Sequence, residues 1–103
     1  MKRIIPLFII LLFVGVNSLY AEVAKGQKMY IKHLQSQCKN MSGSSFASKH
    51  SQDEWEEIYD AGALNSEIKT ICKGKTIDEK LLPHIYDFVY EYANDSGKVP
   101  SRK

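Results

Sequence analysis

The sequence predicts a small all-α domain, and three observations lead to this prediction. In the part of the chain that follows the apolar run near its start, apolar side chains recur at helical spacing near both ends. No stretch alternates apolar and polar residues as a half-buried strand does. Two Ser/Thr-x-x-Glu motifs mark helix starts. The 103 residues, 44% hydrophobic and 25% charged, suit one globular domain, so we expect a bundle of four to five short helices.

The first 21 residues have the layout of a secretory signal peptide. Lys2 and Arg3 precede an apolar run over residues 4–16, and a more polar stretch then ends at Ala21. Because a transmembrane helix needs about 20 apolar residues, this shorter run favours cleavage between Ala21 and Glu22. We therefore expect a periplasmic protein. The alternative is that the segment stays as an uncleaved anchor, which would be the chain's one contact with a membrane.

The charge of the mature chain excludes one class of partner. The formal net charge is +2, and it falls to zero when Lys2 and Arg3 are removed with the signal segment. A neutral domain lacks the basic surface of a nucleic-acid-binding protein. We expect the partner to be another periplasmic or envelope protein.

The mature part divides into a helical domain, residues 22–94, and a tail, residues 95–103. The first helix is expected over 22–34, where Tyr30 and Leu34 share a face with Gly26. Glycine weakens a helix, so Gly26 indicates that another helix approaches closely there.

The remaining elements follow from local signals. A polar loop is expected over residues 38–45 and a short turn near residue 46. Ser51 and Glu54 form a capping box that opens a helix ending at Gly62. A brief helical segment over 66–72 follows. Thr76 and Glu79 offer a second capping box, and the most apolar helix is expected over 83–94 after a short turn.

Cys38 and Cys72 are the two cysteines of the chain. In an exported domain of this size an isolated pair most simply forms a disulfide. The alternative is a redox-active dithiol, but the C-x-x-C spacing that lowers a thiol pKa is absent. We therefore expect a structural Cys38–Cys72 bond.

Three short motifs carry a resemblance to a known family. They are Gly26–Tyr30 in the first helix, Asp53–Ile58 in the middle helix and Ile85–Tyr90 in the last. Their order resembles that of the class I cytochrome c family, which implies a fold whose terminal helices cross through a glycine and aromatic residues.

The haem-binding motif of that family is missing. Cys38 has no second cysteine three residues before it, and Lys39 follows it where the family has its axial histidine. Met41 is the last methionine, so the loop before the last helix offers no axial methionine. The resemblance therefore implies a haem-free relative, in which Cys72 clasps the loop that haem would organise.

The sequence gives no sign of a catalytic or metal site. No serine lies in a G-x-S-x-G or S-x-x-K motif, and the acidic run over 53–60 is typical of a solvated helix start. The three histidines, His33, His50 and His84, have no metal-ligand spacing such as H-x-x-x-H. We expect no enzyme activity, no cofactor and no metal.

Tyr86 and Tyr90 share a helix face that is offset from the apolar stripe. Tyrosine is favoured at protein interfaces, so we expect them to form an interaction surface, although they could equally cover a small core. The leading hypothesis is an exported interaction or structural module. The alternatives are an electron carrier that binds haem unconventionally through Cys38 and a histidine, and a small metal- or ligand-binding protein.

Overall fold

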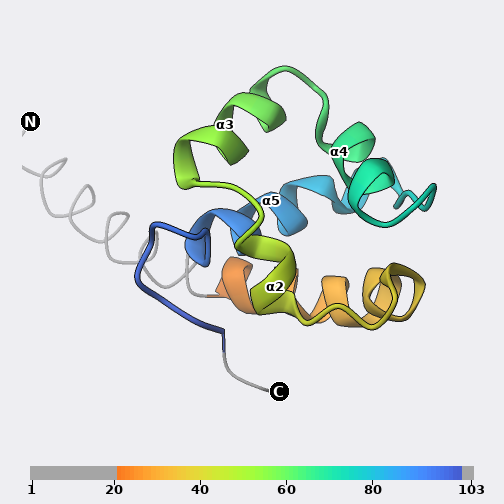
Figure 1. Ribbon diagram of the computed structural model, residues 1–103, viewed down its shortest axis with the longest axis horizontal. Coiled ribbons are helices and arrows are strands. Elements are labelled where there is room, and N and C mark those ends of the chain that lie inside the picture. Colours follow the sequence, from red (N-terminus) through yellow and green to blue (C-terminus); the bar gives the residue numbers. More distant parts are fainter. Residues whose placement is uncertain (1–20, 101–103) are drawn as a thin grey trace, which may run out of the picture.

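The computed structural model describes residues 21–100, and this part contains helices and no strand (Figure 1). The predicted all-α class is thereby confirmed. The predicted signal peptide lies outside the described residues except for Ala21, and so does the end of the predicted tail, residues 101–103. Between residues 21 and 100, no helix has the length and apolar character needed to cross a membrane.

The helices follow one another with short connections. Residues 21–30 are α-helical and continue directly into a π-helix and a 3-10 turn. The later α-helices are separated by turns, and a second 3-10 turn precedes the last of them. In chain order the elements after residue 30 are η1 (Ile31–Gln35), η2 (Ser36–Cys38), α2 (Gly43–Ala47), α3 (Gln52–Asp60), α4 (Leu64–Ile71), η3 (Glu79–Leu81) and α5 (Leu82–Glu91).

The last helix, α5, is the centre of the molecule. In Figure 1 it crosses the middle of the view, with α3 and α4 above it and the segment 21–38 and α2 below it. Ile85, Phe88 and Val89 of α5 are fully buried. The hydrophobic core therefore lies on both sides of α5, and each of the other helices covers part of that helix.

Gly26 is the point at which the first helix touches α5. A Cβ atom at residue 26 would overlap the backbone carbonyl oxygen of His84 and would lie 2.9 Å from the Cβ atom of Phe88. A side chain at this position would push the helices apart. The predicted close approach at Gly26 is confirmed, and its partner is the first half of α5.

Four aromatic rings fill the interior beside this crossing. The Tyr30 ring centroid lies 4.9 Å from that of Phe46 and 5.9 Å from that of Phe88. Phe46 in turn lies 5.9 Å from Trp55 of α3. All four residues are fully buried. The rings connect the first helix, α2, α3 and α5 into one core.

The polar atoms of this aromatic core have hydrogen-bond partners. The Tyr30 hydroxyl donates to the carbonyl oxygen of Met41 at 2.6 Å, and the Trp55 indole donates to the carbonyl oxygen of Ala47 at 2.8 Å. Burial raises the pKa of Tyr30 well above its ordinary value of 10. Within residues 21–100, no buried side-chain nitrogen or oxygen lacks a partner, as expected of a well-packed interior.

The predicted signals at both ends of α3 are confirmed. Ser51 accepts from the backbone N–H of Glu54, and the Glu54 carboxylate accepts from the backbone N–H of Ser51, which completes the capping box. Gly62 follows the helix with a φ of 71°. Its N–H donates to Tyr59 and that of Ala63 donates to Ile58, the hydrogen bonds of a Schellman motif.

The second predicted capping box, at Thr76 and Glu79, is wrong. Asn65 of α4 binds both backbone groups of Ile77, donating to its carbonyl oxygen at 2.8 Å and accepting from its N–H at 3.1 Å. Ile77 is thereby held outside any helix and becomes part of the core. The next helical turn, η3, therefore begins later and is capped by Asp78, which accepts from the N–H of Lys80.

Several boundaries also differ from the predictions. The first helical segment continues to residue 38 rather than 34, and α4 spans 64–71 rather than 66–72. The serine-rich loop contains α2, because Ser42 accepts from the N–H of Ser45 and so starts a helix at residue 43. The last helix begins at Leu82, next to the predicted Pro83, and ends at Glu91 rather than near Asn94.

The predicted Cys38–Cys72 disulfide is confirmed, with a Cα–Cα distance of 4.4 Å. Cys38 ends η2, and Cys72 directly follows α4. Both residues are buried. The bond therefore joins the end of the first helical segment to the end of α4, within the core.

We predict that Gly26→Ala destabilises the protein although alanine is the better helix former. An unhindered Gly-to-Ala change in a helix gains about 0.5–1 kcal/mol. Here the added methyl group meets the α5 backbone, so we expect a net loss of about 1–2 kcal/mol in the free energy of unfolding. Urea unfolding measures it. Lys28→Ala, at an exposed position of the same helix, is the control and should stay within about 0.5 kcal/mol of the wild type.

We predict that the double substitution Cys38→Ser/Cys72→Ser lowers the free energy of unfolding by about 3–4 kcal/mol, because the bond constrains a long loop of the unfolded chain. Urea unfolding with and without a reductant provides the test. The reductant should destabilise the wild type and leave the double variant unchanged. A wild-type midpoint that does not respond to complete reduction would contradict this role.

Candidate functional site

Tyr59, Tyr86 and Tyr90 form a continuous group of half-buried rings on α3 and α5, which we call the tyrosine face. The rings of Tyr59 and Tyr86 are stacked, with centroids 4.2 Å apart and an angle of 8° between their planes. Tyr86 and Tyr90 are tilted neighbours at 5.7 Å. The two predicted surface residues therefore do lie together, and a third ring from another helix extends the group.

Tyr59 is the residue of this face that the sequence did not identify. Its spacing places it beside Trp55 and Ile58, so its residue pattern is that of a core position. In the structure Trp55 is fully buried and Tyr59 is only half-buried. Tyr59 lies four residues after Trp55, which is slightly more than one helical turn. Its side chain is therefore rotated to the edge of the buried face, where it contacts Tyr86.

The tyrosine face lies in a negative electrostatic environment. The pKa of Tyr86 is raised to about 12, first by burial and then by nearby negative groups that include the carboxylates of Glu56, Asp60 and Asp87. Helix α3 carries five acidic side chains and no basic one, and all five are exposed. The face is therefore a group of aromatic rings bordered by carboxylates.

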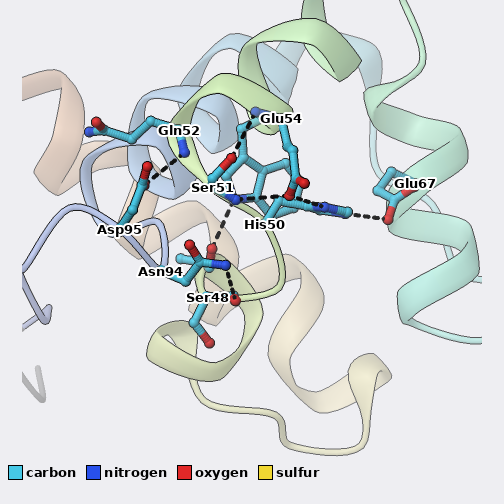
Figure 2. Close-up of polar contacts among 10 residues, drawn as sticks. Ser48, His50, Ser51, Gln52, Glu54, Glu67, Asn94 and Asp95 are labelled. Atoms are coloured by element: carbon cyan, nitrogen blue, oxygen red, sulfur yellow. Dashed lines mark hydrogen bonds and ion pairs between the residues drawn. The ribbon is translucent and has the colours of Figure 1, made fainter.

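The position of α3, and with it that of Tyr59, depends on the turn over residues 48–52 (Figure 2). Residues that follow α5 hold this turn. Asn94 donates from its backbone N–H to the carbonyl oxygen of His50 and from its side chain to that of Ser48. The Asp95 carboxylate accepts from the backbone N–H of Gln52 at 3.0 Å. Asp95, the first residue of the predicted tail, thus helps to cap α3.

His50 links the start of α3 to α4. Its Nδ1 lies 3.2 Å from Glu54 Oε1, and its Nε2 lies 2.7 Å from Glu67 Oε2, so the two carboxylates lie on opposite sides of the ring (Figure 2). The ring also meets Trp55 edge-on, with centroids 4.7 Å apart. This arrangement uses both ring nitrogens and is that of a structural bridge.

A second histidine, His84 at the start of α5, faces the first helix. Its Nδ1 lies 3.1 Å from Glu22 Oε1. One ligand atom from each of Glu22, His84 and Asp87 lies within 4.8 Å of the other two. Burial, and then the nearby Glu22 carboxylate, raise the pKa of Asp87. The sequence did not reveal this cluster because Glu22 is 62 residues away from His84 along the chain.

A hollow of about 510 Å³ lies between the first helical segment and the C-terminal residues. Gln27, Ile31 and Gln35 line one side, and residues 42–44 and 99–100 line the rest. Ile31 and Val99 are the large hydrophobic side chains that are exposed among residues 21–100. Among the described residues, those that line the hollow offer side-chain amides and hydroxyls to a ligand.

Between residues 21 and 100, the cysteine that a thioether bond to haem would require is not free. The Cys38 sulfur is bonded to Cys72, so it is not free to form a thioether. The four buried aromatic rings occupy the interior next to Cys38 and the first helix. Met41 packs against this core, and its carbonyl oxygen binds Tyr30.

We predict that Glu54 makes the stability of the protein depend on pH below the ordinary pKa of a glutamate, 4.5. The Ser51 N–H and then His50 bind the Glu54 carboxylate and lower its pKa. This contribution is therefore complete above pH 4.5 and is lost as the pH falls through the lowered pKa of the folded state. Glu54→Gln should reduce the acid slope of the unfolding free energy, measured by urea unfolding at a series of pH values.

The control for this prediction is Glu57→Gln, on the same helix and also exposed, which leaves the contacts of Glu54 with Ser51 and His50 in place. It should keep the acid slope of the wild type. Equal slopes for Glu54→Gln and the wild type would show that the capping carboxylate does not contribute.

Comparison with known proteins gives no relative: no family model, no curated protein and no solved structure matches the chain. The resemblance to the class I cytochromes c therefore rests on the short motifs around Gly26, Trp55 and Phe88.

Proposed function

We propose that the protein is an exported, haem-free helical module of cytochrome c-like outline that binds another protein of the periplasm or envelope through its tyrosine face. In this proposal it catalyses no reaction. The observation that carries the proposal is the stack of Tyr59 on Tyr86, continued by Tyr90, at a half-buried site. Rings already held by one another lose little conformational freedom on binding, and tyrosine is enriched among the residues that contribute most to protein interfaces.

The charges around the face favour a partner with a basic surface. Glu56, Asp60 and Asp87 all act on the Tyr86 hydroxyl, so their negative field reaches the rings. A lysine or arginine of the partner could pair with these carboxylates and lie over a tyrosine ring. Such a complex should form faster at low salt, because exposed charges are screened at high ionic strength.

The core and the disulfide support the haem-free part of the proposal. An electron carrier attached through Cys38 would need a free thiol there, and the Cys38 sulfur is already bonded to Cys72. The aromatic core formed by Tyr30, Phe46, Trp55 and Phe88 also gives the domain an interior that is complete without a cofactor. Visible absorption of protein made together with a haem-attachment system distinguishes the two functions, because a coloured product would favour the electron carrier.

We predict that a photo-reactive phenylalanine analogue at residue 90 forms a discrete cross-link to one partner in the cell. The same analogue at residue 69, an exposed position of α4, is the control and should give no such product. With the captured partner, Glu56→Lys/Asp60→Lys should weaken binding about tenfold, because the substitutions place positive charges opposite a basic surface.

Glu79→Lys is the matched charge control, since Glu79 is an exposed acid in η3 that is not among the carboxylates acting on Tyr86. It should leave the affinity within about twofold of the wild type. The proposal is contradicted if position 90 gives no cross-link, or if Glu79→Lys weakens binding as much as the double reversal does.

A further inference from the structure

We propose that Glu22, His84 and Asp87 bind a divalent transition-metal cation of the Zn²⁺ type. The three side chains come from two different helices, and one ligand atom of each lies within 4.8 Å of the others. Two of them, His84 and Asp87, are three residues apart on α5 and so project from the same side of that helix. Glu22 completes the group from the first helix.

The distances suit a small metal ion. Zinc lies about 2.0–2.2 Å from imidazole nitrogen and carboxylate oxygen, which places neighbouring tetrahedral ligand atoms about 3.3 Å apart. The distance between His84 Nδ1 and Glu22 Oε1 is 3.1 Å, close to that value. The two ligand atoms that lie farthest apart, at no more than 4.8 Å, have to come at most about 1.5 Å closer. Rotation of a partly exposed carboxylate supplies this movement.

The ligand set indicates the class of ion. One imidazole and two carboxylates form a set that suits zinc and its neighbours in the first transition row, whereas magnesium and calcium prefer oxygen ligands alone. The two carboxylates lie close together and repel each other. A divalent cation between them removes that repulsion. Three protein ligands leave a fourth position for water.

The helix crossing at Gly26 holds the group in place. Glu22 lies one turn before Gly26, and a Cβ atom at Gly26 would overlap the carbonyl oxygen of His84. The backbones of the two ligand-bearing helices are therefore in contact next to the site. Because the ligands extend from packed helices and not from loops, little ordering is required when an ion binds. The side chains of His84 and Glu22 remain 21% and 44% exposed, which leaves access from solvent.

His50 provides the contrast within the same molecule. It also has two carboxylate neighbours, Glu54 and Glu67, but each binds a different ring nitrogen. The carboxylates therefore lie on opposite sides of the imidazole (Figure 2) and cannot meet on one ion. At His84, by contrast, Nδ1 lies next to Glu22, and ligand atoms of Glu22, His84 and Asp87 all lie within 4.8 Å of one another. The same residue types thus form a bridge at one histidine and a converging group at the other.

The test is a titration of the full chain, purified in mild detergent because of its apolar residues 4–16, with Zn²⁺ as the probe. Calorimetry should give one bound ion per chain, and saturating Zn²⁺ should raise the melting temperature. Co²⁺ in place of Zn²⁺ should give visible absorption bands that report nitrogen and oxygen ligands. His84→Gln should weaken Zn²⁺ binding by more than about tenfold and remove the Co²⁺ bands, and Glu22→Gln should also weaken binding.

His50→Gln is the matched control and should bind Zn²⁺ as the wild type does. If His84→Gln does not fold, Glu22→Gln still tests the site, because Glu22 is the more exposed of the two residues. The proposal is overturned if the wild type does not bind Zn²⁺, if His84→Gln and Glu22→Gln bind it unchanged, or if His50→Gln loses the same affinity. None of these outcomes bears on the cross-link from residue 90, so the two proposals can fail separately.

Discussion

The direct contact between the Gly26 backbone and α5 is the constraint on which the rest of the structure depends. Because residue 26 has no side chain, the first helix lies so close to α5 that a Cβ atom would have no space beside the His84 carbonyl oxygen. One turn later this approach brings the Tyr30 ring against Phe88 and begins the aromatic core. One turn earlier it brings Glu22 to His84. A single small residue therefore sets both the core and the proposed metal site.

The parts of the fold that could be predicted from the sequence are those determined by neighbouring residues. Ser51 and Glu54 cap each other across three positions, and Gly62 accepts the left-handed conformation that ends α3. Thr76 and Glu79 have the same local pattern, yet no helix starts there. The amide of Asn65, twelve residues away, binds the backbone of Ile77 on both sides and prevents it. The local motif was outweighed by a tertiary interaction that the pattern does not contain.

The same distinction separates the two candidate sites. Tyr86 and Tyr90 are one helical turn apart, so their shared surface could be predicted from spacing, whereas Tyr59 joins them only because α3 packs on α5. The Glu22, His84 and Asp87 group combines a three-residue spacing with a partner near the other end of the domain. No spacing rule could identify it. α5 contributes to both sites, which makes it the helix that connects folding with the proposed functions.

The place of α5 in the chain has a consequence for when the protein can fold. Because α5 spans Leu82–Glu91 and supplies the centre of the core, the preceding helices have no complete interior until those residues are available. A ribosome must therefore translate the chain through Glu91 before the native packing can be completed, and a chain passing N-terminus first through a narrow channel cannot complete it until α5 has emerged. The loop closed by Cys38 and Cys72 contains no residue of α5, so oxidation can precede that final step.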